Sequence, residues 1–306
     1  MGRPLLLLSV AGLLPLAAAT RAAFAADASP TWAYPPAQTS SVPRSTRQFS
    51  ETAIFDRTRP VDWFPGDHPA MPDAVQGRAQ QFACGYCHSP DGGGRPENAA
   101  LAGVPEAYIV RLVADMKSGA RAYDPHLNNS ANMVMAAKLS SDADVRSAAQ
   151  YFAGLKYRKR LKVVEAADIP RATANSVYFF DTGGARESIG QRIVEGPDDA
   201  ERFRRRDPHT TYTAYVPPGS LARGAALARG GDGRASCESC HGPGLRGSAE
   251  APPLAGRFAT AQFRQLYDFS KGLRGGAQAA KMKQAVSGLS QSDMLALAAY
   301  AASLEP

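Results

Sequence analysis

The chain has few of the residues that usually form functional sites, with four cysteines, five histidines and two tryptophans among 306 residues. All four cysteines occur in two pairs, and the members of a pair are too close together to make useful structural disulfides. After residue 25 the sequence also lacks any apolar run of the roughly 20 residues that a membrane span needs. These absences argue against a disulfide framework and against an integral membrane protein.

The N-terminus has the pattern of a secretory signal peptide, residues 1–25. Arg3 precedes an uncharged stretch, Pro4–Thr20, and Ala23–Ala25 fits the small-x-small cleavage rule. The alternative is an uncleaved anchor. We expect export to the periplasm, where free thiols rarely persist, so the cysteines need another role.

The two cysteine pairs each belong to a C-x-x-C-H motif, "CGYCH" and "CESCH". This spacing is the attachment signature of haem c, because two thiols form thioethers with the porphyrin vinyl groups and the following histidine ligates iron. The motifs predict two covalently bound haem c groups. The attachment residues are Cys84, Cys87, Cys237 and Cys240, with iron ligands His88 and His241.

Two other interpretations of the cysteines are weaker. A thioredoxin-like dithiol usually stands alone in a strand–helix setting, and a zinc site would join pairs that lie 153 residues apart. Neither predicts a histidine directly after both pairs.

An internal repeat surrounds the motifs. The offset of 153 residues that separates Cys84 from Cys237 also relates Leu101 to Leu254, and an offset of 149 relates Tyr151 to Tyr300. One four-residue deletion in the second copy explains the change, so the fold is duplicated. Each copy is predicted to form three helices. The first leads into the C-x-x-C-H motif, and the second ends at Gly119 in one copy and at Gly272 in the other. The third follows serine caps near residues 141 and 290.

The sixth iron ligands are predicted to be Met133 and Met282, which are equivalent at the offset of 149 and are expected in loops before the last helix. A thioether ligand raises the haem potential and suits electron transfer. Methionine is more often a core filler, and Met135 competes with Met133 in the first copy. His126 is a further alternative ligand there.

With these motifs the sequence resembles the two-haem class I cytochromes c of the cytochrome c4 type. The resemblance rests on the C-x-x-C-H motifs, the repeated Leu-Ala-Gly, the two methionines and the terminal helices, and covers about residues 72–157 and 219–305. It implies periplasmic electron transfer and two haem domains packed face to face.

The sequence departs from that family in two segments. We call residues 26–71 the arm, which is rich in proline, serine and threonine, and residues 158–218 the insertion. Within the insertion, residues 161–169, 176–180 and 191–196 are predicted to be short strands, in a small hairpin. The expected fold is therefore all-α, with two tandem class I cytochrome c domains (72–157 and 219–306), an irregular arm and a short β-containing insertion.

The sequence favours an electron carrier over an enzyme. We expect electrons to come from a dehydrogenase or a quinol-oxidising complex and to pass to an acceptor such as a terminal oxidase, with a dedicated cytochrome subunit of a dehydrogenase as one variant. Basic runs at residues 156–162 and 202–206 suggest steering of an acidic redox partner or an anionic membrane surface, and nucleic acid is not expected. The alternatives are a dihaem peroxidase and a small-molecule oxidoreductase with one open or unusually ligated haem.

Overall fold

The computed structural model describes residues 39–78, 81–122, 130–175, 177–231, 234–276 and 278–306, together with Gly2. The chain divides into two units, Met1–Ala37 and Gln38–Pro306, and the second unit contains all the elements described below. Apart from Gly2, the predicted signal peptide lies outside the described residues, as does His126.

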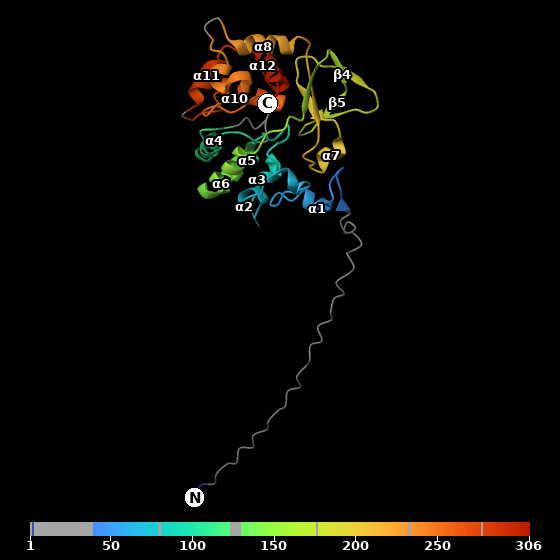
Figure 1. The fold of residues 1–306 in the computed structure, drawn as a ribbon, viewed down its shortest axis with the longest axis vertical. Coiled ribbons are helices and arrows are strands. Elements are labelled where there is room, and N and C mark those ends of the chain that lie inside the picture. The colour runs from blue at the N-terminus through green and yellow to red at the C-terminus, as the bar shows by residue number, and fades with distance from the viewer. Residues whose placement is uncertain are drawn as a thin grey trace. The chain divides into compact units, whose positions relative to one another are not determined.

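The described part of the first repeat forms five helices, coloured cyan to green in Figure 1. They are α2 (Asp73–Gln76), α3 (Cys84–His88), α4 (Glu106–Ser118), α5 (Ser130–Leu139) and α6 (Asp142–Ala153). Helices α4 and α6 pack together, and the main core cluster of this repeat includes Ile109, Ala149 and Phe152. The tandem helical architecture expected from the sequence is therefore present.

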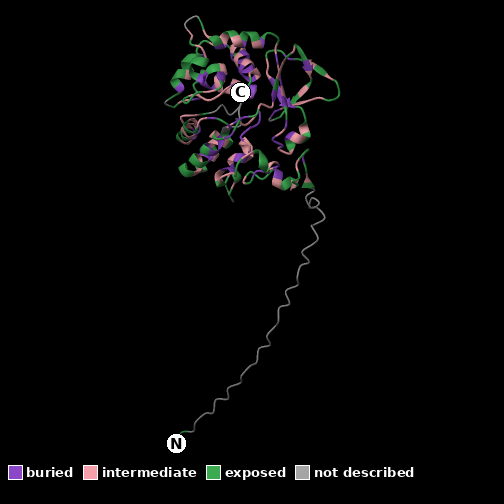
Figure 2. Ribbon diagram, viewed as in Figure 1, coloured by how far each residue is buried: buried purple, intermediate pink, exposed green. Residues whose placement is uncertain are grey.

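The second repeat, orange to red in Figure 1, is built in the same order. Its elements are α8 (Ser220–Arg229), α9 (Glu238–His241), the 3₁₀ helix η2 (Pro243–Leu245), α10 (Ala259–Ser270), α11 (Ala279–Val286) and α12 (Gln291–Ser303). Helix α12 is buried along most of its length (Figure 2), because its alanines allow α8 to approach closely. A Cβ atom at Gly224 of α8 would overlap the Ala296 carbonyl, so only glycine permits this contact.

The predicted helix ends are largely confirmed. Helix α4 ends at Gly119, which adopts the left-handed conformation (φ 79°) that glycine tolerates. Ser141 and Ser290 cap the N-termini of α6 and α12 by accepting hydrogen bonds from Asp144 N and Asp293 N. These caps are equivalent in the repeat.

The first helix of the first repeat is much shorter than expected. In place of a helix as long as α8, the described chain has the four-residue helix α2, which ends at Gly77 (φ 101°). A Cβ atom at Gly77 would lie 1.8 Å from the Thr58 carbonyl oxygen, so the arm lies against the chain at the point where the helix ends. Helix α2 contacts α6 as α8 contacts α12, and the His68 ring of the arm lies 6.4 Å from the Tyr151 ring of α6.

The insertion contains more β-structure than the predicted hairpin, so the all-α expectation was too simple. Strands β3 (Leu161–Glu165), β9 (Tyr212–Val216) and β8 (Val194–Pro197) form a sheet in the order β3-β9-β8, with β3 and β9 parallel. Further pairs join β4 (Asp168–Pro170) to β7 (Arg186–Ser188) and β5 (Ala172–Ala174) to β6 (Tyr178–Phe180), and α7 spans Ala200–Arg204. Strand β9 was missed, although Tyr212, Ala214 and Val216 alternate with less buried residues, as a half-buried strand requires.

The insertion shares a core with the second repeat. Tyr212 and Ala214 of β9 belong to one hydrophobic cluster with Phe258 and Ala302. Glu195 of β8 is buried and accepts hydrogen bonds from Ala259 N at 2.7 Å and from Thr260 Oγ1, so that a strand of the insertion caps α10. The two segments are therefore packed as one body.

The two repeats also touch directly. The buried Arg257 donates hydrogen bonds to the carbonyls of Ala100 (2.8 Å) and Ala102 (2.7 Å), and its guanidinium lies over the Tyr157 ring. Burial lowers the Arg257 pKa to about 10. This contact ties the Leu-Ala-Gly segment of the first repeat to that of the second.

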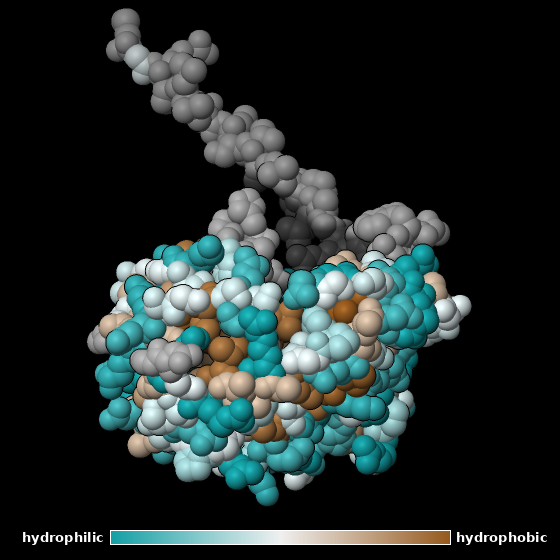
Figure 3. Space-filling view, turned by 90° about the horizontal axis from the view of Figure 1, so that it is seen from above, coloured by the Kyte–Doolittle hydropathy of each residue, from teal (hydrophilic) through white to brown (hydrophobic). Residues whose placement is uncertain are grey.

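The arm contains only short elements from Thr39 to Met71: strands β1 (Thr39–Ser40) and β2 (Phe49–Ser50), helix α1 (Glu51–Ile54) and the 3₁₀ helix η1 (Pro65–Asp67). Some apolar side chains remain at the surface among polar ones, as one face shows in Figure 3. Two large ones, Met135 (44% exposed) and Leu139 (59%), lie on α5. Within the described ranges, no helix is long and apolar enough to span a membrane.

Candidate haem sites

Both C-x-x-C-H motifs fold as a single helical turn. In the second motif His241 N donates to the Cys237 carbonyl at 2.9 Å, which is the hydrogen bond of a helical turn. The first motif forms α3 in the same way, and none of the four cysteines is in a disulfide. Each turn therefore brings two thiols and one imidazole together, the donor set that haem c attachment needs.

The two histidines are oriented by equivalent hydrogen bonds. His88 Nδ1 contacts the Ala99 carbonyl and His241 Nδ1 contacts the Pro252 carbonyl, both at 2.8 Å and both 11 residues along the chain. A carbonyl accepts only from an N–H, so Nδ1 carries the proton and Nε2 keeps a lone pair for a metal. Burial lowers the pKa of both imidazoles, which favours the neutral form that ligates iron.

The thiols do not have the electrostatics of a redox dithiol. Burial raises the pKa of Cys84 to about 11, and it also raises the pKa values of Cys87 and Cys237. Reactive dithiols have lowered thiol pKa values instead. No group of three or more histidine, cysteine or acidic residues in the described part of the chain is placed to hold a metal ion.

The predicted sixth ligands lie in helices, so the expectation that they lie in loops was wrong. Met133 lies in α5 and Met282 in α11, whose sequences consist largely of strong helix formers such as alanine, lysine and methionine. The side chains have matching environments, since Met133 packs with Met116 of α4 and Met282 with Phe269 of α10, which are equivalent at the offset of 153. Both are partly buried, whereas Met135 is exposed.

The first attachment helix and Met133 pack on different hydrophobic clusters, which one helix joins. Cys84 packs on the main core of the first repeat, and the His88 ring lies 6.2 Å from the Phe152 ring. Met133 belongs to a second cluster. Helix α4 joins the two clusters, because Ile109 belongs to the first and Val113 to the second.

The first attachment helix is covered by segments from outside the repeat. Ala83 N donates to the Arg57 carbonyl of the arm at 2.9 Å. From the insertion, the Arg206 guanidinium lies 3.5 Å from the centre of the Tyr86 ring and donates to the Tyr86 carbonyl at 2.8 Å. In the sequence Arg206 stands out only as part of a basic run, and nothing local in the sequence predicts this long-range contact.

Most of the basic residues proposed for partner steering have partners within the protein. Arg202 pairs with Asp207, Arg158 with Asp67, and Lys159 with Glu305. Arg160 donates to the carbonyls of Pro208 and Gly94. These contacts favour an internal, structural role for the two runs over a role in steering.

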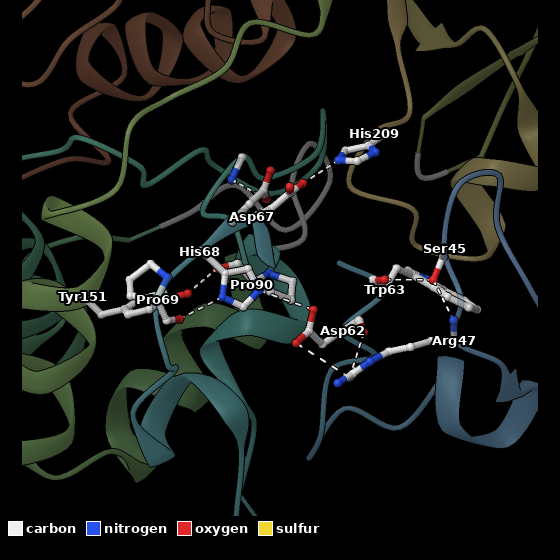
Figure 4. Close-up of polar contacts among 12 residues, drawn as sticks. Ser45, Arg47, Asp62, Trp63, Asp67, His68, Pro69, Pro90, Tyr151 and His209 are labelled. Atoms are coloured by element: carbon white, nitrogen blue, oxygen red, sulfur yellow. Dashed lines mark hydrogen bonds and ion pairs between the residues drawn. The ribbon is translucent and has the colours of Figure 1, made fainter. Parts of the chain in front are cut away.

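Polar contacts of the arm are drawn in Figure 4. His209 Nε2 of the insertion lies 2.6 Å from an Asp67 carboxylate oxygen, and the His209 ring stacks on Phe64. Within the arm, His68 lies between Asp62 (Nε2 to Oδ1, 3.3 Å) and the Pro69 carbonyl (Nδ1 to O, 2.9 Å). The stretch around Phe64 and Asp67 therefore packs against the insertion.

Comparison with known proteins agrees with this geometry. Residues 221–305 match the family model described as cytochrome c. The chain is 27% identical over 237 residues to cytochrome c4 from Azotobacter vinelandii, and the match covers 76% of this chain and 89% of that protein.

Several solved structures are also similar. A thiosulfate dehydrogenase (TsdBA) from Marichromatium purpuratum has a TM-score of 0.49 and 26% identity, and the match covers 73% of this chain but only 37% of that chain. Reduced cytochrome c4 from Pseudomonas stutzeri has a TM-score of 0.46 and 25% identity, with 72% and 93% covered. Cytochrome c4 from Acidithiobacillus ferrooxidans has a TM-score of 0.46 and 20% identity, with 72% and 98% covered.

The family match covers the second repeat, and the first repeat has the equivalent attachment turn, so the chain binds two haem c groups covalently. The chain is similar to cytochrome c4 over 76% of its length, and this similarity supports electron transfer as its chemistry.

Proposed function

We propose that this protein is a periplasmic dihaem electron carrier. It would take electrons from a dehydrogenase or a quinol-oxidising complex and pass them to an acceptor such as a terminal oxidase. The observation that carries the proposal is the matched pair of histidines, His88 and His241, each with its Nδ1 held 2.8 Å from a backbone carbonyl. That arrangement presents Nε2 to an iron atom in both repeats.

The residues present fit haem c at both sites. The thiols of each motif lie in one helical turn with the histidine, and burial keeps the imidazoles neutral. We assign the attachment to Cys84, Cys87, Cys237 and Cys240, and the proximal ligation to His88 and His241. The haem supplies an iron atom that cycles between the ferric and ferrous states.

Met133 and Met282 are the proposed sixth ligands. Their equivalent positions on α5 and α11 and their matching contacts with Met116 and Phe269 support one role in both repeats. Thioether ligands on both irons suit a carrier, because a filled sixth site leaves no position for peroxide or a small substrate. The cytochrome c domains proposed from the sequence, residues 72–157 and 219–306, would each enclose one such iron.

The test is an optical and near-infrared spectrum of the purified, haem-loaded protein, with the sulfur-to-iron charge-transfer band quantified per haem. We expect two haems per chain and a band intensity equal to two methionine-ligated irons. A band for one haem only would contradict the pure carrier function and favour a peroxidase or small-molecule oxidoreductase. Fractionation that finds the haem protein outside the periplasm would contradict the localisation.

A further inference from the structure

The two attachment helices are equivalent in the repeat but differ in what lies against them. Gly85 and Tyr86 of the first motif correspond to Glu238 and Ser239 of the second, at the offset of 153. Gly85 is buried and Tyr86 is partly buried, whereas Glu238 and Ser239 are exposed. The same turn of helix is therefore enclosed in one repeat and open in the other.

Helix α2 packs on the first helix so closely that only glycine fits at residue 85, and the arm lies beside the same position. A Cβ atom at Gly85 would lie 2.8 Å from the Val75 carbonyl oxygen and 3.2 Å from Cγ of Pro60 in the arm. The hydrogen bond from Ala83 N to the Arg57 carbonyl fixes the same stretch of the arm at the start of α3. Residues 57–60 of the arm thus form one side of the cover.

The insertion forms the other side. Arg206 adopts a left-handed backbone conformation (φ 57°), which a non-glycine residue keeps only when its surroundings hold it there. Its guanidinium is held by stacking on Tyr86 and by the hydrogen bond to the Tyr86 carbonyl. Trp63 Nε1 donates to the Arg205 carbonyl at 2.8 Å, which joins the two parts of the cover.

The second helix has only local partners among the described residues. Cys237 N donates to the Ala228 carbonyl, Glu238 accepts from Gly244 N, and Ser248 Oγ donates to the Cys240 carbonyl. Cys240 is exposed, whereas the other three cysteines are partly buried. Because a thioether sulfur is bonded to the periphery of the porphyrin, the open turn around Ser239 and Cys240 would leave its haem edge less covered than the edge at Cys87.

We propose that electrons enter and leave the protein through the haem edge at Cys240, and that the arm and insertion shield the first haem, which exchanges electrons through the second. The partner is a redox protein that docks against the small side chains beside Cys240, Ser239 and Ser248, where its cofactor can approach closely. One electron reduces the second iron from ferric to ferrous, and its transfer to the first haem restores the ferric state, with no bond formed or broken. The proposal rests on haem occupancy of both motifs.

The first test measures the solvent access of each haem in the fully reduced, haem-loaded chain. Two haems per chain are confirmed beforehand, so a failure of the proposed function is detected separately. A neutral gadolinium chelate is then titrated while the thioether-methyl proton signals are followed by NMR, assigned through contacts with Tyr86 and Ser239. We expect the signals of the second haem to broaden several-fold more than those of the first. Equal broadening would overturn the proposal.

Variants of the cover sharpen this test. Arg206→Ala should increase the broadening of the first haem, because it removes the stacking on Tyr86. Arg204→Ala is the control, since Arg204 ends α7 two positions before Arg206, is 61% exposed, and makes its contacts with Glu201 and the Phe179 ring rather than with Tyr86. An unchanged first haem in Arg206→Ala would count against the cover.

A kinetic test addresses the route itself. Ser239→Trp should slow oxidation of both haems by ferricyanide several-fold, because the first haem depends on the second. Thr182→Trp, at an exposed position of the insertion, is the control for adding a surface indole. If Ser239→Trp slows the second haem but leaves the first at its original rate, the first haem has its own route and the proposal is wrong.

Discussion

Arg121 and Arg274 stand at equivalent positions of the two repeats and face each other in an antiparallel backbone bridge. Each repeat donates one hydrogen bond and accepts one, so the contact has approximate twofold symmetry. The bonds run from Ala122 N to the Leu273 carbonyl (2.8 Å) and from Gly275 N to the Ala120 carbonyl (2.7 Å).

This bridge depends on a glycine. A Cβ atom at Gly275 would lie 2.6 Å from the Ala120 carbonyl oxygen, so Gly275→Ala should push the strands apart and lower the free energy of unfolding by about 1–3 kcal/mol. Gly66→Ala is the control, because a Cβ atom there meets nothing within 4 Å. Urea unfolding of the haem-loaded variants measures both, and equal stabilities would show that the bridge is not constrained.

The proposed axial ligands give a spectroscopic prediction. Met133→Ala and Met282→Ala should each remove half of the sulfur-to-iron band and lower the potential of one haem by a fraction of the ~0.8 V range that axial ligands span. Met135→Ala should change neither quantity, since that side chain is 44% exposed. Loss of the band in Met135→Ala with retention in Met133→Ala would reverse the assignment.

The folded conformation of the arm should be more stable at low pH. A hydrogen bond to Asp62 raises the pKa of His68, and only the doubly protonated ring donates both to Asp62 and to the Pro69 carbonyl. The stabilisation from a raised pKa is complete below the ordinary value of 6.5 and is lost as the pH rises through the folded-state value. The groups around the ring also include Tyr151 and the more distant Asp91.

Hydrogen exchange of residues 60–72 checks this pH dependence. After correction for the intrinsic rate, exchange should be slower at pH 5.5 than at pH 8.5 in the original chain. His68→Gln should abolish the difference. A pH dependence that persists in His68→Gln would assign the effect to another group.

A long-range cap gives a stability prediction. Glu195→Ala would leave the buried N–H of Ala259 without its acceptor, at a cost of about 2–3 kcal/mol in the free energy of unfolding. Glu195→Gln keeps an acceptor oxygen and should cost less. Glu201→Ala serves as the control, because Glu201 is 60% exposed. A loss as small as that of Glu201→Ala would exclude the capping role.

Local patterns in the sequence predicted the helical part of the fold well. The glycine after α4 and the serine caps of α6 and α12 are signals within a few residues of the element they define, and the structure confirms them. The attachment turns were also predicted correctly, because the C-x-x-C-H spacing alone identifies the residues that bind haem. The prediction of a loop at Met133 was wrong, because the segment consists largely of strong helix formers and folds as α5.

The missed features depend on residues that are distant in sequence. Strand β9 pairs in parallel with β3, about 50 residues earlier, and no turn signal marks such a pairing. Arg206 reaches Tyr86 across 120 positions. The glycine of "CGYCH" was a usable clue, because its counterpart in the second motif is a glutamate, but its meaning needs the positions of Val75 and Pro60.

The shared core around Tyr212 has a consequence for how the molecule melts. Phe203 of α7 belongs to the same cluster as Tyr212 and Phe258, and Arg95 of the first repeat stacks on its ring at 3.7 Å. The insertion therefore shares a core with the second repeat and contacts the first repeat through Arg95. Neither repeat can unfold without exposing surface of the insertion that it had buried. Duplication here has produced two redox centres inside one cooperative folding unit, and calorimetry would register a single heat-absorption peak where two independent domains would give two.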